Sequence, residues 1–290
     1  MIDFCLVLLD SSGNSPTDTR TTINMGLGTT IRLARIFSHG SGSLFGAAID
    51  HFVGYGDVRA GGLADLPTAL TKIIAAGPDS MTMLAGTAKH LWTPYAGRAA
   101  LIIQGGMFTP DDRVQQLVAT PEDAARLGAD ALAVAIPVRG SSEGTYLRWL
   151  TDSVRAAAAL EIPVVAHIYP RDSDQKIVFE PEGIAWAVRC GIEAGVDVIK
   201  VGYPGDEAAF AEIIAACPAP VVMAGGPKTA TFTEALQQIV EGQRAGARGA
   251  VVGRNMWGAP DITAAALAYK AVIQEGRSAD EAAALVPSEG

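Results

Sequence analysis

The sequence predicts an α/β fold, a single (β/α)8 TIM barrel with an N-terminal extension helix. From about residue 44 onward, eight short apolar runs alternate with helical segments. Strands that are apolar throughout are typical of a parallel sheet covered by helices. The runs begin roughly 20 to 36 residues apart, which brackets the ~31 residues expected when about 250 residues form eight βα units. Eight such units favour a closed barrel over an open sheet.

The predicted strands follow one another without a linker or a second domain. Helix signals separate them: Thr120 is an N-cap ahead of Pro121 and two acidic residues, and Pro181 opens a helix that runs to Gly195. The eight predicted strands are residues 44–50, 80–84, 99–103, 131–135, 164–168, 196–201, 221–224 and 249–252.

The remaining residues are predicted to flank the barrel within one domain, 1–290. Residues 1–40 form an N-terminal extension, in which 26–37 have the pattern of a short amphipathic helix packed under the barrel. Residues 275–290 hold a C-terminal helix, which the capping-box sequence Ser278-Ala279-Asp280-Glu281 opens.

Composition limits the classes of partner. The chain has 290 residues, of which 49% are hydrophobic and 18% charged, so a large core is expected and disorder is not. The net charge of -9 argues against nucleic acid or an anionic membrane as a partner, and no apolar run approaches the length of a membrane span. Cys5, Cys190 and Cys217 have no metal-like spacing, which fits a reduced, cytoplasmic protein.

Lys200 is an unusual residue for its position. The pattern glycine, Ala or Val, any residue, strand occurs at Gly128, Gly195 and Gly246, and each glycine is predicted to end a helix in the left-handed conformation. Lys200 takes a strand position that the other two copies give to an alanine and a valine. A buried amine costs free energy unless something uses it. Lys200 is therefore either a side chain that snorkels from an ordinary strand end or an amine nucleophile whose pKa is lowered by burial.

Polar residues at the ends of other predicted strands suit such a nucleophile. Active sites of these barrels lie at the carboxyl ends of the strands. Asp50 and His51 end the first predicted strand, and His167 and Tyr169 end the fifth. An imine-forming lysine needs an acid/base, for which Tyr169 is the candidate, and a carboxylate, for which Asp50 is the candidate. His51 and His167 are candidate hydrogen-bonding groups for a substrate.

The loops after the last two predicted strands indicate a phosphate site. Gly225 and Gly226 follow strand seven, and Gly253 and Arg254 follow strand eight. Glycine-rich loops at these two strands are the usual phosphate site of the barrel, and Arg254 or Lys228 can add a charged contact. The alternative is that the glycines only form tight turns.

The sequence gives no reason to expect a metal or a cofactor. The chain has four histidines and no acidic cluster at metal-ligand spacing, so no metal is expected. A flavin-binding oxidoreductase barrel would also hold phosphate on such loops, but it has no need of a lysine in strand six. A non-catalytic sugar-phosphate sensor would leave the buried lysine unexplained.

Taken in order, these motifs resemble the DeoC/FbaB-type class I aldolases. That group includes the archaeal-type fructose-bisphosphate aldolases and the autoinducer-2 3-hydroxy-5-phosphonooxypentane-2,4-dione thiolase. The motifs span nearly the whole chain: Arg32-Leu33-Ala34-Arg35-Ile36-Phe37, Ala48-Ile49-Asp50-His51, Ile168-Tyr169-Pro170-Arg171, Asp197-Val198-Ile199-Lys200, Gly225-Gly226-Pro227-Lys228 and Gly253-Arg254-Asn255.

The resemblance implies roles for several residues. Lys200 would be the Schiff-base lysine, Tyr169 the proton donor and Asp50 the carboxylate of strand one. It also implies a homo-oligomer, often a ring-shaped decamer, and a phosphate held by Gly225, Gly226, Gly253 and Arg254. The chain departs from the family pattern on the substrate side, where Asp172 follows Tyr-Pro-Arg in place of the usual glycine.

The sequence therefore predicts a Schiff-base-forming class I aldolase, an aldehyde-lyase, that acts on a phosphorylated ketose and depends on dihydroxyacetone phosphate. The alternative is an acyl or aldol transferase of the phosphonooxypentanedione thiolase type or of the transaldolase-like synthase type. A flavin-binding oxidoreductase barrel is the third and less favoured possibility.

Overall fold

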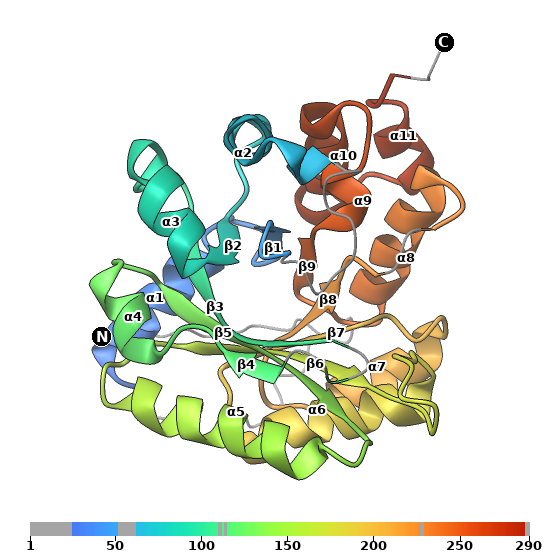
Figure 1. The fold of residues 1–290 in the computed structure, drawn as a ribbon. Helices are drawn as coiled ribbons and strands as arrows, with labels where there is room; N and C mark the ends of the chain where they lie inside the picture. The colour runs from blue at the N-terminus through green and yellow to red at the C-terminus, as the bar shows by residue number, and fades with distance from the viewer. Residues whose placement is uncertain (1–24, 52–61, 110–111, 113–114, 227–228, 288–290) are drawn as a thin grey trace, which may run out of the picture.

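Eight parallel strands close into a barrel (Figure 1). The computed structural model describes residues 25–51, 62–109, 112, 115–226 and 229–287. Each barrel strand pairs in parallel with two neighbours in the order β1-β2-β3-β5-β6-β7-β8-β9, and β9 returns to β1, which confirms the predicted (β/α)8 barrel. The strands are β1 Leu44–Ala48, β2 Ser80–Leu84, β3 Ala100–Phe108, β5 Ala131–Val138, β6 Val164–Pro170, β7 Val198–Val201, β8 Val221–Ala224 and β9 Gly249–Val252.

Two strands differ from their predicted form in ways that affect the site. β1 ends at Ala48, so Asp50 lies just beyond the strand rather than within it. β3 continues to Phe108 because a short strand that was not predicted, β4 Gln115–Leu117, pairs with its end in the antiparallel direction. This extension carries β3 beyond Gln104, where its pairing with β2 ends, and brings Phe108 to 5.8 Å from the Tyr169 ring.

Helices cover the outside of the barrel (Figure 1). Thr120 is the predicted N-cap of α4, and Ser278 caps α11 in the predicted capping box. Thr120 also forms a capping box with Asp123, which was not predicted. Gly128, Gly195 and Gly246 have φ angles of 67°, 77° and 106°, which is the predicted left-handed conformation before β5, β7 and β9. The helices are α2 Leu66–Ala75, α3 Ala85–Leu91, α4 Pro121–Arg126, α5 Glu143–Ala158, α6 Pro181–Ala194, α7 Glu207–Ala215, α8 Phe232–Arg244, α9 Arg254–Trp257, α10 Ile262–Glu275 and α11 Ala279–Ala283, with 3-10 turns η2 Gly62–Ala64 and η3 Thr93–Tyr95.

The helix α1 Leu27–Ile36 closes the amino-terminal end of the barrel. Its Ile36 is fully buried in the same apolar cluster as the inward-facing residues of the strands, such as Val165 and Val198. Arg35 pairs with Asp130, which immediately precedes β5. The predicted N-terminal helix is thus found beneath the barrel, and the carboxyl ends of the strands are left to form a site.

Three aspartates tie strands together at the amino-terminal end. Asp79, Asp130 and Asp197 each stand immediately before a strand and accept a hydrogen bond from a backbone N–H of the neighbouring strand, at 2.8, 3.1 and 2.8 Å. Burial raises the pKa of Asp79 and Asp197. In the described part of the chain, no helix is long and apolar enough to cross a membrane.

Candidate active site

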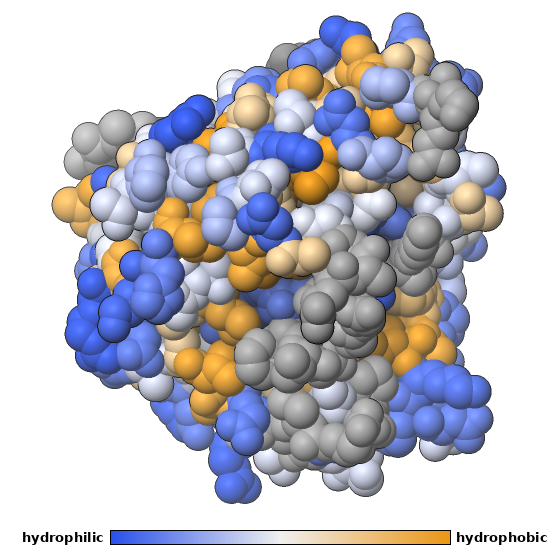
Figure 2. All heavy atoms as spheres, turned by 45° about the horizontal axis from the view of Figure 1, so that its top comes forward, coloured by the Kyte–Doolittle hydropathy of each residue, from blue (hydrophilic) through white to orange (hydrophobic). Residues whose placement is uncertain are grey.

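A cavity of about 280 Å³ lies at the carboxyl ends of the strands. Nine of the ten candidate residues line it, and Lys228 lies outside the described residues. The face shown in Figure 2 is hollowed near its centre, where hydrophilic atoms form part of the floor. The nine candidates come from the loop after β1 (Asp50, His51), β6 (His167, Tyr169), β7 (Lys200) and the loops after β8 and β9 (Gly225, Gly226, Gly253, Arg254).

Lys200 is held in the wall of this cavity by β7. Lys200 is only 5% exposed and lies directly opposite His167 of β6 in the sheet register. Burial lowers the pKa of Lys200 to about 8, an effect that the nearby Arg254 cation adds to and the Asp50 carboxylate opposes. With that pKa, about a tenth of the amines are neutral at pH 7. Lys200 can therefore act as a nucleophile toward a carbonyl carbon near neutral pH.

His167 is a neutral neighbour of this amine. It is 2% exposed, and burial together with the Lys200 cation lowers its pKa well below the ordinary value. Its Nε2 atom has no hydrogen-bond partner within the described part of the chain. A neutral imidazole beside Lys200 adds no positive charge to that of Arg254.

Tyr169 and Asp50 supply the other polar groups of the cavity. Burial, and secondarily the Asp50 carboxylate, raise the pKa of Tyr169, so its phenol keeps its proton at neutral pH. The Asp50 side chain is 14% exposed, and its Oδ1 lies 3.8 Å from Nδ1 of His51. Burial lowers the pKa of His51, whose ring packs edge-on against Trp257 at 5.0 Å. The cavity thus combines a proton donor with a carboxylate near Lys200.

The two glycine-containing loops are joined to each other. Asn255 donates from Nδ2 to the carbonyl of Gly225 at 2.8 Å, and Arg254 donates from Nη2 to the carbonyl of Gly226 at 3.4 Å. Gly226 has a φ angle of 69°, which favours glycine. At Gly253 a Cβ atom would lie 2.8 Å from the His51 ring, so only glycine lets the loop approach that closely.

Sequence reasoning missed three residues that shape the cavity. Asn255 ties the two loops together, a role that its sequence motif does not indicate. Ile177 and Phe179, from the loop after β6, also line the cavity. Their alternation in Lys176-Ile177-Val178-Phe179, directly after a site strand, is the signal that could have identified them.

A charged network contacts Tyr169 indirectly, through the Phe108 ring. The Arg171 guanidinium stacks 5.2 Å from the Phe108 ring, which in turn packs 5.8 Å from the Tyr169 ring. Arg171 is 2% exposed and pairs with Asp112 at 2.8 Å. The Asp112 carboxylate also accepts a hydrogen bond at 2.7 Å from the Tyr146 hydroxyl.

Asp112→Asn is expected to remove a pH-dependent part of the stability. Hydrogen bonds from Arg171, Ser142 and Tyr146 outweigh the cost of burial and lower the pKa of Asp112 to about 2 in the folded chain. Because the folded pKa lies below the unfolded one, the stabilisation of about 2 kcal/mol is present above pH 4 and is lost as pH falls toward 2.

Urea unfolding of both proteins between pH 7 and pH 3 measures this effect. We expect the gap between wild type and Asp112→Asn to narrow as the pH falls. Asp152→Asn, which breaks an exposed pair with Arg155 on α5, is the control and should change stability little at any pH. A gap for Asp112→Asn that stays constant over this range would contradict the role given to the carboxylate.

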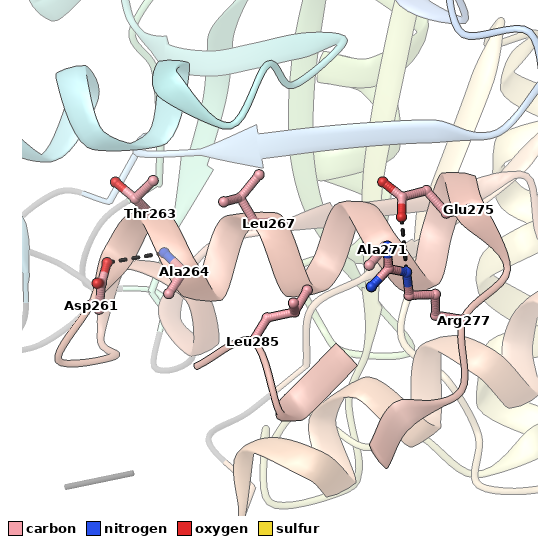
Figure 3. Close-up of a pocket in the computed structure, with 8 residues that line it drawn as sticks. All are labelled: Asp261, Thr263, Ala264, Leu267, Ala271, Glu275, Arg277 and Leu285. Carbon is pink, nitrogen blue, oxygen red and sulfur yellow. Dashed lines mark hydrogen bonds and ion pairs between the residues drawn. The ribbon is translucent and has the colours of Figure 1, made fainter. Parts of the chain in front are cut away.

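A second hollow lies on the outer surface, away from the candidate catalytic residues (Figure 3). It has a volume of about 390 Å³ and lies between α10 and the segment around Leu285. Its charged residues already have partners, since Asp261 caps α10 and Glu275 pairs with Arg277. No residue of the catalytic candidates lines it, so the smaller cavity at the strand ends is the candidate active site.

The described residues contain no group of three or more His, Cys, Asp or Glu side chains that could hold a metal ion. The cavity instead has the parts of an imine-forming site: a buried amine, a phenol, a carboxylate and glycine loops with an arginine. Such a set suits reversible carbonyl chemistry on a phosphorylated compound.

Comparison with known proteins identifies the family of this chain. The model of the DeoC/LacD family of aldolases matches residues 45–259, and the chain belongs to that family. It is thus a member of the class I, lysine Schiff-base aldolases, which are carbon–carbon lyases. Membership of this family excludes the possibility that the chain is a flavin-binding oxidoreductase.

Three relatives illustrate the range of the family. The 2-amino-4,5-dihydroxy-6-oxo-7-(phosphonooxy)heptanoate synthase of Streptomyces griseus is 31% identical over 80% of this chain and 85% of its own. The 2-amino-3,7-dideoxy-D-threo-hept-6-ulosonate synthase of Halobacterium salinarum is 32% identical over 89% and 95%. The structure of an archaeal fructose-1,6-bisphosphate aldolase, with its catalytic lysine bound to a carbinolamine intermediate, aligns with a TM-score of 0.76 at 30% identity over 85% and 99%.

Proposed function

We propose that this aldolase joins and splits dihydroxyacetone phosphate and an aldehyde through an imine on Lys200. The observation that carries the proposal is the surroundings of this amine, which is 5% exposed and whose pKa is lowered to about 8 by burial. An amine that costs folding free energy and faces a polar cavity is best explained by its chemistry.

The proposed reaction begins with the neutral Lys200 amine. Its Nζ attacks C2 of the ketose phosphate to give a carbinolamine, which loses water and becomes an iminium ion. Cleavage of the C3–C4 bond sends its electron pair into the iminium and leaves an enamine. The C4 hydroxyl passes its proton to the oxygen of Tyr169, the reverse of the donation in bond formation, and the aldehyde departs. Protonation at C3 and hydrolysis then release dihydroxyacetone phosphate and restore the amine.

Tyr169 and Asp50 are proposed to handle the protons. In the direction of bond formation, the Tyr169 phenol donates its proton to the aldehyde oxygen as the enamine carbon attacks. The raised pKa of Tyr169 ensures that the phenol carries this proton at neutral pH. Asp50 balances the positive charge of the iminium, consistent with its effect on the pKa of Lys200.

Proton exchange tests the donor half of this reaction without any aldehyde. An enamine formed from dihydroxyacetone phosphate must take up a solvent proton at C3. In deuterium oxide, the protein should therefore replace one C3 proton of dihydroxyacetone phosphate with deuterium, as followed by proton NMR. Absence of exchange above that of buffer would contradict the proposed donor.

The synthase names of two relatives favour a second candidate. The matches cover 85% and 95% of the length of these relatives, and both relatives are named as synthases of seven-carbon compounds. The second candidate is an aldol or acyl transferase with the same Lys200 imine and another ketose phosphate as donor. Trapping of an imine with other ketose phosphates, but no exchange with dihydroxyacetone phosphate, would favour it.

Arg254→Ala is expected to weaken binding of a phosphorylated substrate roughly 10- to 150-fold, because a hydrogen bond to a charged group contributes about 1.5–3 kcal/mol. Arg254 is exposed, lines the cavity and contacts the loop after β8. Dihydroxyacetone, which lacks the phosphate, should react weakly with both proteins and change little.

The apparent KM for each compound in the exchange assay measures this effect. Arg189→Ala, which removes an exposed arginine of α6 paired with Glu193, is the matched control. An equal loss for dihydroxyacetone and its phosphate would mean that Arg254 acts on the Lys200 pKa rather than on the phosphate.

A further inference from the structure

The loop after β6 returns along the strand because of one aspartate. Asp172 accepts hydrogen bonds through Oδ1 from the backbone N–H groups of Asp174 and Lys176, at 2.9 and 2.8 Å. The turn that this closes lets Ile177 pair with Arg171 in an antiparallel bridge. Val178 then donates to the carbonyl of Pro170 at 2.9 Å. The returning segment therefore runs beside the end of β6.

This segment gives the cavity an apolar wall. Ile177 and Phe179 both line the cavity and pack against the hydrophobic core. Phe179 also covers the loop after β7, since a Cβ atom at Gly202 would lie 2.1 Å from its ring. The absence of a side chain at Gly202 thus lets the ring lie against the segment that follows Lys200.

The apolar wall and the phosphate loops lie on opposite sides of Lys200. β7 stands between β6 and β8 in the barrel, so Lys200 separates the loop after β6 from the loops after β8 and β9. A substrate whose carbonyl carbon reaches Lys200, and whose phosphate reaches Gly225 and Arg254, extends its other end toward Ile177 and Phe179.

No free cation meets that other end within the described residues. Arg171 is the arginine nearest in sequence, but its guanidinium is engaged by Asp112 at 2.8 Å and by the carbonyl of Thr109 at 3.0 Å. Arg139, after β5, pairs with Glu180 and Glu182. The described cations that line the cavity are Lys200 and Arg254. A second phosphate would lose its hydration here without gaining a cationic partner among the described residues, which is unfavourable.

We propose that Ile177 and Phe179 determine specificity by seating an uncharged, largely apolar aldehyde portion, so that the preferred substrate is a ketose monophosphate. This inference rests on the proposed function, since it takes the phosphate and the imine carbon from it. It adds what chemistry the other end of the substrate has.

Cleavage rates of three substrates test the proposal on the unmodified protein. Fructose 1,6-bisphosphate, fructose 1-phosphate and 6-deoxyfructose 1-phosphate share the dihydroxyacetone phosphate half and differ only at C6. We expect kcat/KM for 6-deoxyfructose 1-phosphate to exceed that for the bisphosphate at least tenfold, with release of dihydroxyacetone phosphate as the readout. A bisphosphate cleaved as well as the deoxy sugar, or better, would overturn the inference.

A charge placed in the wall tests the residues themselves. Ile177→Lys should reduce the preference for 6-deoxyfructose 1-phosphate over the bisphosphate at least tenfold, because the new cation can pair with the second phosphate. The ratio of two substrates on one protein is unaffected by the amount of folded enzyme. Leu160→Lys adds the same charge at a position outside the cavity, 37% exposed, and should leave the ratio unchanged. An unchanged ratio in Ile177→Lys would contradict the role of the wall.

The proton-exchange assay distinguishes failure of this specificity proposal from failure of the proposed imine chemistry. If the unmodified protein exchanges the C3 proton of dihydroxyacetone phosphate but prefers the bisphosphate, the apolar wall is misassigned and the imine chemistry stands. If it neither exchanges that proton nor cleaves any of the three sugars, the proposed donor fails, and the specificity inference fails with it.

Discussion

Replacing Lys200 with methionine is expected to abolish turnover, by about 10⁴-fold or more, while raising the stability of the protein. Methionine has a similar length and no amine, so the imine cannot form. The stability should rise because burial lowers the pKa of Lys200 from its ordinary value to about 8. The folded chain therefore binds this proton less tightly than the unfolded chain does, which costs about 3 kcal/mol below pH 8.

The stability gained by removing Lys200 should depend on pH in a defined direction. The cost of Lys200 is fully present below the folded pKa of about 8 and disappears as the pH rises toward the unfolded value. The midpoint of urea unfolding at pH 7 should thus be higher for Lys200→Met than for wild type, and the difference should shrink by pH 10. Lys72→Met, at an exposed position of α2, is the control and should alter neither property. A variant that is inactive and destabilised would indicate a structural lysine instead.

Tyr169→Phe is expected to lower kcat by about 10²-fold or more, without preventing imine formation. The ring still packs against Phe108, so the substitution removes the phenol proton and little else. Since Lys200 is untouched, the imine should form and accumulate, because the step that needs the proton is slowed.

Pre-steady-state mass spectrometry of the intact protein measures that accumulation. Tyr95→Phe removes a hydroxyl that hydrogen-bonds Thr71 outside the cavity, and it should behave as wild type. Near-normal turnover in Tyr169→Phe would transfer the acid/base role to Asp50 or to water.

The sequence was sufficient for the barrel and for most of the cavity because both follow from local patterns. Left-handed glycines such as Gly195 and a charged residue within an apolar strand can be recognised without knowledge of the rest of the chain. The carboxyl ends of parallel strands meet at one end of a barrel, so residues as distant as Asp50 and Arg254 could be predicted to share a cavity.

The features that escaped prediction depend on contacts between distant segments or on turn geometry. The pairing of Arg171 with Asp112 crosses 59 residues and follows no sequence pattern. The apolar wall exists because Asp172 closes a turn that brings Ile177 back beside β6. The extension of β3 likewise depends on the antiparallel strand β4, whose three residues are too few to give a periodic signal.

Borohydride reduction with dihydroxyacetone phosphate tests the central claim most directly. Reduction converts an imine into a stable amine, and trypsin does not cleave after a lysine so modified. The adduct should therefore appear on an uncleaved peptide of residues 190–228, and on none of the five other lysines of the chain. Modification of another lysine, or no adduct with any ketose phosphate, would contradict the assignment of Lys200 as the imine-forming residue.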